Sequence, residues 1–161
     1  MTWRQLLFIL AAGILALVLY LGWSWQPERQ VQNRFEDLIA ALEKRNLKKV
    51  KALISPEYRD EWGLRPDDLV KLSDEMLRQF FWVEITPVEP RVTRTDRGVE
   101  VRTRLQLQGN GTALAQAALS RAGEWREPFV FVWRKESGKP WDWKLASMSQ
   151  SELNLQAIPW E

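Results

Sequence analysis

Residues 99–108 read VEVRTRLQLQ, in which apolar or β-branched side chains alternate with charged or amide side chains. Successive side chains of a β-strand point to opposite faces, so this stretch predicts a long strand with one buried face and one wet face. The turn-like sequence TDRG at 95–98 predicts that the residues around Val92 pair with this strand as an antiparallel hairpin. The fold therefore contains a half-buried antiparallel sheet.

A second hairpin is expected near the C-terminus. Residues 129–133, FVFVW, are apolar on both faces, and residues 141–145, WDWKL, alternate. The connection SGKP at 137–140 is typical of a turn. A further short strand is expected at residues 81–85, broken afterwards by two prolines, Pro87 and Pro90, that belong at an edge or bend.

A short helix is expected between the two hairpins. Residues 113–122 are rich in alanine, Thr112 is a good N-cap, and Gly123 is a good C-terminal stop. Ten residues are too few for an isolated helix in water, so this helix must dock on its own sheet or on a partner. Leu114 and Leu119 supply part of its apolar surface.

Upstream of the sheet, the apolar period is that of helices. An amphipathic helix is predicted over residues 28–46 and a shorter one over 47–54, which Ser55-Pro56 ends. Pro66 suits the first turn of a third helix that extends to about residue 80. The predicted class is α+β, with three helices packed on a curved, mostly antiparallel sheet and a short inserted helix.

The N-terminus carries an uncharged run from Gln5 to Pro27 with an apolar centre from Leu6 to Leu21. About 18 residues at roughly 1.5 Å each nearly cross a hydrocarbon core of about 30 Å. We therefore expect a membrane anchor at 1–26, followed by one folded domain at 27–161.

A cleaved signal peptide is the main alternative to an anchor, since residues 22–24, GWS, offer a small-x-small match. The length of the run and the bulky Trp23 and Trp25 favour the anchor. A buried core helix would normally show a polar stripe, and none is visible. The short N-terminal tail favours a single-pass protein with its domain outside the cytoplasm.

Composition limits the chemistry. The chain contains neither histidine nor cysteine, which excludes histidine-based acid–base catalysis, thiol chemistry and most familiar zinc or iron sites. No metal or cofactor is expected. Without Arg4, the remaining 22 basic residues nearly balance the 21 acidic ones, so nucleic acid is not an expected partner.

Two stretches carry a resemblance to a known superfamily: residues 40–46, AALEKRN, and residues 53–60, LISPEYRD. With the order of three helices followed by long strands, they resemble the helical corner of the NTF2-like, or cystatin-like, superfamily, which includes SnoaL-like and ketosteroid-isomerase-like proteins. The resemblance covers about residues 28–150. It implies a cone whose mouth holds a ligand, an active site or nothing, and the inserted helix departs from that pattern.

Two groups of residues are candidates for a site. A catalytic version would have to use carboxylates, Tyr or Lys, and Tyr58, Asp60 and Glu61 form the cluster to test; a capped, solvated turn with Tyr58 packed on the core is the structural alternative. Aromatic residues of the strands are the candidates for a pocket lining or, as we favour, for the core: Trp82, Phe131, Trp133, Trp141 and Trp143.

The expected function is that of a non-catalytic membrane-anchored domain. Besides the membrane, its expected partner is a protein partner or a second copy, or alternatively a small apolar ligand. The alternative is a SnoaL-like isomerase, dehydratase or hydrolase that uses carboxylate and tyrosine chemistry in an aromatic cone. An open cavity with a buried carboxylate would favour the enzyme, and a filled cone would favour the binding domain.

Overall fold

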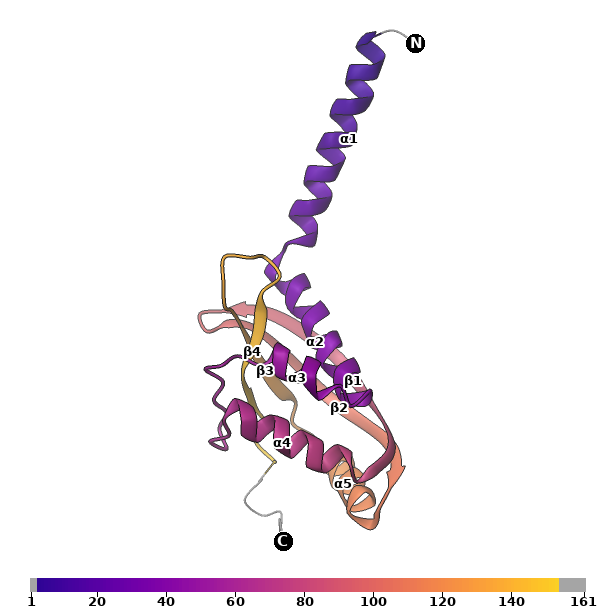
Figure 1. Ribbon diagram of the computed structural model, residues 1–161, viewed down its shortest axis with the longest axis vertical. Helices are drawn as coiled ribbons and strands as arrows, with labels where there is room; N and C mark the ends of the chain where they lie inside the picture. Colours follow the sequence, from indigo (N-terminus) through magenta and orange to yellow (C-terminus); the bar gives the residue numbers. More distant parts are fainter. Residues whose placement is uncertain (1–2, 154–161) are drawn as a thin grey trace.

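The computed structural model describes residues 3–153, which form five helices and four strands (Figure 1). In chain order these are α1 Trp3–Ser24, α2 Pro27–Glu43, α3 Leu47–Leu53, α4 Pro66–Leu77, β1 Phe80–Thr95, β2 Gly98–Gly111, α5 Ala113–Glu124, β3 Phe129–Lys135 and β4 Trp143–Ser149. The expected α+β class is confirmed: after the apolar helix α1, three helices (α2, α3 and α4) precede the sheet, and α5 is inserted between β2 and β3.

The strands form one antiparallel sheet in the order β1-β2-β3-β4, so both expected hairpins are present. In such a meander the β1–β2 and β3–β4 turns lie at one end of the sheet, and the β2–β3 connection lies at the other. The start of α2 lies at the first end, where Glu28 forms an ion pair with Arg94 at 3.2 Å. Helix α5 marks the second end (Figure 1).

The expectation of a separate short strand at 81–85 is wrong, because β1 runs unbroken from Phe80 to Thr95. The prolines are accommodated because β1 is an edge strand, where a missing backbone donor breaks no ladder. The pairing instead shifts register between Val88 and Arg91, and Glu89 there has a φ of 49°. The strand bends at this bulge rather than ending.

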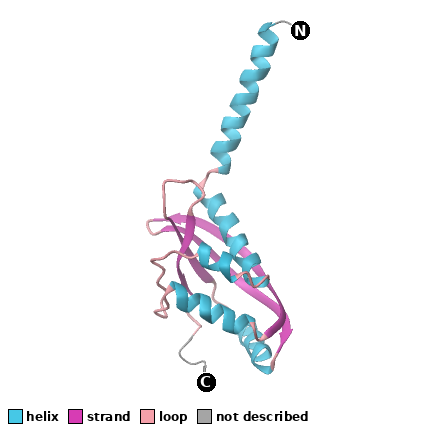
Figure 2. Ribbon diagram, in the orientation of Figure 1, coloured by secondary structure: helices cyan, strands magenta, loops and turns pink. Residues whose placement is uncertain are grey.

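Helices α2, α3 and α4 cover one face of the curved sheet (Figure 2). The apolar stripe of α2 buries Val31, Phe35, Leu38 and Ile39, as its spacing predicts. The ring of Phe35 lies 5.0 Å from the ring of Phe131 on β3. The buried core is thus formed between α2 and the concave face of the sheet.

Each free edge of the sheet is covered in part. On β1, the Arg45 guanidinium donates to the carbonyls of Phe80 and Phe81, and the Glu43 carboxylate accepts from the Ile85 amide at 2.7 Å. On β4, the Ser55 amide donates to the Leu145 carbonyl at 2.9 Å. These contacts occupy backbone groups that would otherwise be free to pair with another chain.

Helix α5 begins at Thr112, whose side chain accepts from the Ala115 amide at 3.4 Å, as expected of an N-cap. It docks on its own sheet through Ala115 and Ala122, which are both buried. Close approach is required there, because a Cβ at Gly111 would lie 2.8 Å from the Ala115 Cβ. Leu114 is half exposed, so its side chain does not contribute to this docking on the sheet.

Helix α1 extends away from the domain (Figure 1). Its segment Leu7–Ser24 is long and apolar enough to cross a membrane, and none of it is buried against the rest of the protein. A core helix would be buried by its neighbours, so that alternative does not apply to α1.

Candidate functional site

Tyr58 and Asp60 lie together in the segment between α3 and α4. The Tyr58 hydroxyl donates to the Asp60 carboxylate at 3.0 Å. The other carboxylate oxygen of Asp60 accepts from the backbone amides of Trp62 and Leu64 at 3.0 and 2.8 Å. Asp60 therefore organises its own turn, in the manner of an Asx turn, while holding the tyrosine hydroxyl.

Glu61 points to a different partner. Its carboxylate accepts from the Gln150 amide at 2.6 Å, which connects this turn to the end of β4. Nearby, the Trp62 indole N–H donates to the Leu153 carbonyl at 2.8 Å. The structure thus brings Tyr58 and Asp60 together as a hydrogen-bonded pair, and gives Glu61 a separate contact with the backbone.

The Tyr58 side chain is fully buried. Burial, followed by the negative charge of Asp60 and the hydrogen bond to it, raises the pKa of the Tyr58 hydroxyl far above its usual value near 10. The hydroxyl is therefore a neutral donor at physiological pH. The Tyr58 and Asp60 oxygens can share a proton. In this arrangement, however, the Tyr58 hydroxyl already donates its hydrogen bond to Asp60 and not to a ligand.

The five aromatic candidates divide into two groups. Phe131, Trp133 and Trp143 are buried together in the main core, as we favoured over a pocket lining. Trp82 and Trp141 are 52% and 49% exposed, so the expectation that they belong to the core is wrong. Trp82 lies at the start of the edge strand β1, and Trp141 precedes β4 in a turn, so neither is enclosed between sheet and helices.

The interior of the cone is occupied by large side chains of the protein. Trp133 and Tyr58 are the largest of the fully buried residues, and the Trp133 indole N–H has no hydrogen-bond partner. Protein interiors are close-packed, so buried side chains of this size leave little room for a ligand beside them.

Within residues 3–153, Glu100 is the one buried carboxylate. It alternates on β2 with Val99 and Val101, which belong to the core, so its side chain lies on the opposite face of the sheet. There it forms ion pairs with Arg97 at 2.7 Å and Arg102 at 3.3 Å. It is therefore not placed as an acid or base inside the cone.

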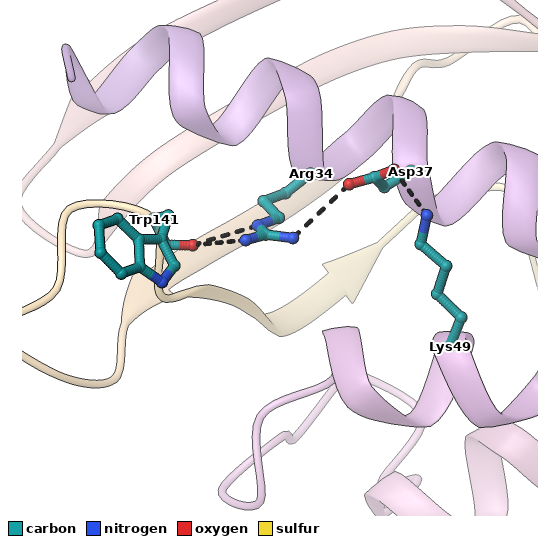
Figure 3. Close-up of polar contacts among 4 residues, drawn as sticks. All are labelled: Arg34, Asp37, Lys49 and Trp141. Carbon is teal, nitrogen blue, oxygen red and sulfur yellow. Dashed lines mark hydrogen bonds and ion pairs between the residues drawn. The ribbon is translucent and has the colours of Figure 1, made fainter. Parts of the chain in front are cut away.

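Helix α2 also fixes the loop between β3 and β4 (Figure 3). The Arg34 guanidinium donates from Nε and Nη2 to the Trp141 carbonyl, at 3.1 and 3.0 Å. Asp37 joins Arg34 to Lys49 of α3, with an Asp37–Lys49 distance of 2.7 Å. Sequence analysis missed this bridge because the partners lie 107 residues apart, and no local pattern identifies a carbonyl as an acceptor.

The junction between α1 and α2 is likewise held by specific contacts. The Gln30 side-chain amide donates to the Ser24 carbonyl at 2.7 Å, and the Arg29 guanidinium lies 3.3 Å from the ring centre of Trp23. Such cation–aromatic contacts stabilise a positioned pair. No cluster of three or more acidic side chains suited to a metal ion occurs among the residues that the structure describes.

Neither a family model nor a curated protein matches this sequence. Solved structures do resemble its fold. They include an NTF2-like protein from Cytophaga hutchinsonii, with a TM-score of 0.52, 11% identity, and coverage of 74% of this chain and 92% of that one. Another is the hexachlorocyclohexane dehydrochlorinase LinA-type3 from Novosphingobium barchaimii LL02, with a TM-score of 0.55, 11% identity, and coverage of 73% and 80%.

A third similar structure is Bd1075 from Bdellovibrio bacteriovorus, with a TM-score of 0.56 and 13% identity. The match covers 75% of this chain but only 39% of Bd1075, so the likeness concerns less than half of that protein. Identities this low indicate a shared fold and not a shared activity. The expected NTF2-like, or cystatin-like, fold is confirmed.

The raised pKa of Tyr58 predicts how stability depends on pH. Because the hydroxyl ionises near pH 10 in the unfolded chain but not in the folded one, the unfolded state is favoured as pH rises above about 10. The chain contains two tyrosines, so Tyr20→Phe leaves Tyr58 as the only one. In that variant, tyrosinate absorbance should appear together with the loss of circular dichroism.

Tyr58→Phe is the matched variant. At neutral pH it should lower the free energy of unfolding by about 1 kcal/mol, because the hydrogen bond to Asp60 is lost. The difference in the free energy of unfolding between this variant and the parent should shrink above pH 10. Only the parent contains a buried tyrosine that must stay neutral in the folded state, so only the parent loses stability there. Tyrosinate formation near pH 10 in a chain that remains folded would contradict the burial of Tyr58.

Proposed function

We propose that this protein is a single-pass membrane-anchored, non-catalytic domain with an NTF2-like fold. Residues 1–26 form the anchor and residues 27–161 the domain, which lies outside the cytoplasm and binds a partner protein beside the membrane. The observation that carries the proposal is α1, whose apolar segment Leu7–Ser24 is unburied and leads directly into the folded domain. Exposure of so much apolar surface to water is unfavourable, and a bilayer removes it.

The contacts at the junction support an anchor over a cleaved signal peptide. Signal cleavage after residue 24 would remove Trp23 and the Ser24 carbonyl, which hold Arg29 and Gln30 of α2. An anchor keeps them and sets the direction in which the domain leaves the membrane.

Because side chains occupy the interior of the cone, we favour binding of a partner at the surface over binding of a substrate inside the cone. Its buried aromatic side chains fill the space that in an enzyme would admit a substrate. Large apolar side chains are instead exposed near the start of β1, where Phe81 is 74% exposed and lies next to Trp82. Exposed aromatic residues of this kind are typical of protein-binding surfaces, so a partner protein or a second copy is favoured over a small apolar ligand.

An enzyme is the second candidate, on the strength of the Tyr58–Asp60 pair. A dehydrochlorinase is among the proteins that share the fold, and a buried tyrosine beside a carboxylate is a plausible acid–base pair. The use of both Asp60 oxygens in local hydrogen bonds supports the structural role instead.

The anchor is tested by fractionation of the full-length chain expressed in bacterial cells. The uncleaved chain should remain in the membrane fraction through washes with high salt and alkaline carbonate. The double change Leu10→Lys and Leu17→Lys should release it, because each lysine near the helix centre costs about 2.5–3.5 kcal/mol of insertion free energy. Leu114→Lys on α5 is the control and should stay with the membranes. A soluble wild-type product that begins near Trp25 would establish the signal-peptide alternative.

The partner surface is tested by photo-crosslinking in cells with p-benzoylphenylalanine in place of Phe81. We expect a crosslinked product whose mass identifies a second copy or another protein. The same probe in place of Thr93, which is exposed near the other end of β1, is the control. Equal yields at the two positions would argue against a specific surface at Phe81.

A further inference from the structure

We propose that the end of the domain nearest α1 docks on the anionic headgroups of the bilayer that α1 spans, through Trp141 and the basic side chains of the β3–β4 loop. This inference rests on the proposed anchor, and it adds a second membrane contact. The contacts at the junction of α1 and α2 set the direction in which the domain leaves the membrane, and a second contact would fix which surface of the domain faces the lipid.

Topology places the loop where it can reach the bilayer. The β1–β2 and β3–β4 turns share the end of the sheet at which α2 begins. Figure 1 shows the β3–β4 loop rising beside the junction of α1 and α2, while α5 lies at the opposite end of the domain. A membrane surface that surrounds the end of α1 would therefore meet this loop first.

Trp141 is suited to such a surface. Its side chain is half exposed, and tryptophan favours the headgroup region because its ring is apolar and its indole N–H is polar. The loop that carries it is fixed by the two Arg34 hydrogen bonds to its carbonyl (Figure 3). The Trp143 indole N–H adds a bond to the Pro140 carbonyl at 3.0 Å. The ring is thus presented by an ordered loop.

The loop also carries excess positive charge. Residues 134–144 contain four basic and two acidic side chains, namely Arg134, Lys135, Lys139 and Lys144 against Glu136 and Asp142. Lys135 and Lys139 are exposed and form no ion pair within residues 3–153. Glu136 is engaged by the Ser55 hydroxyl. Asp142 and, on the neighbouring turn, Asp96 oppose the attraction in part.

Anionic phospholipid is the occupant that matches these features together. Where the leaflet that faces the domain contains anionic lipid, its negative surface potential attracts basic side chains, and an interfacial tryptophan adds apolar contact. The opposite end of the domain offers a comparison, because Trp82 has nearly the same exposure as Trp141 but lies on β1 next to the α5 end of the sheet. If solvent exposure alone determined contact with the lipid, Trp82 and Trp141 would contribute equally to it.

The absence of cysteine allows a single probe to be placed in the full-length chain. Gly138→Cys places a thiol-linked fluorophore in the β3–β4 loop, and Gly123→Cys places it on α5. Both glycines are exposed and have nothing within 4 Å of an added Cβ. Each variant is reconstituted into nanodiscs that contain a headgroup-nitroxide lipid as quencher, either in phosphatidylcholine alone or mixed with phosphatidylglycerol.

In phosphatidylglycerol discs, quenching should be at least two-fold greater at position 138 than at position 123. It should fall to the level of the position 123 probe in phosphatidylcholine alone, and also when Trp141→Ala and Lys139→Gln are added. Trp82→Ala should leave it unchanged. Quenching that ignores lipid charge and these two changes would mean mere proximity, or a protein partner at the loop, and would overturn the proposal.

Co-elution of the chain with the discs is read separately and reports the anchor. A chain that stays in the discs without selective quenching at position 138 refutes the second contact and leaves the anchor intact. A chain that does not enter the discs refutes both.

Discussion

The packing of α2 into the concave face of the sheet is the contact on which the rest of the structure depends. Phe35 meets Phe131 across this interface, and Trp133 is fully buried in the same core. These side chains occupy the interior, which is why the proposed function is placed at the surface. The same helix begins next to α1, so the helix that closes the core also connects the domain to the apolar segment.

Polar contacts connect α2 to the turns at one end of the sheet. Arg34 lies on α2 yet holds the β3–β4 loop, and Glu28 at the start of α2 pairs with Arg94 beside the β1–β2 turn. One helix therefore connects the apolar segment, the core and both turns at one end of the sheet. Antiparallel order places both turns at the end of the sheet where we propose a membrane contact, while the exposed aromatic residues of β1 lie toward the other end.

Periodicity in the sequence predicted the elements well, because amphipathic helices and half-buried strands impose their own spacing on residues such as Phe35 and Val101. It could not separate Trp143, which is buried, from Trp141, which is exposed two residues earlier, because the strand begins between them. Pro87 and Pro90 indicated an edge or a bend, but not that β1 continues through a bulge, because the continued pairing depends on its register with β2. The Tyr58–Asp60 pair was identified as a candidate, but its hydrogen bonds required the fold.

The central claim is that the cone is filled by side chains of the protein, and the Trp133 indole lies inside it. Its side chain has no exposure to solvent. Hydrogen exchange of the tryptophan side chains, followed by NMR on the full-length chain, should show Trp133 exchanging only through global unfolding, far more slowly than Trp82 and Trp141. Exchange of Trp133 at a rate close to theirs would mean that the interior opens to water, and would contradict the account in favour of a ligand-binding or catalytic cone.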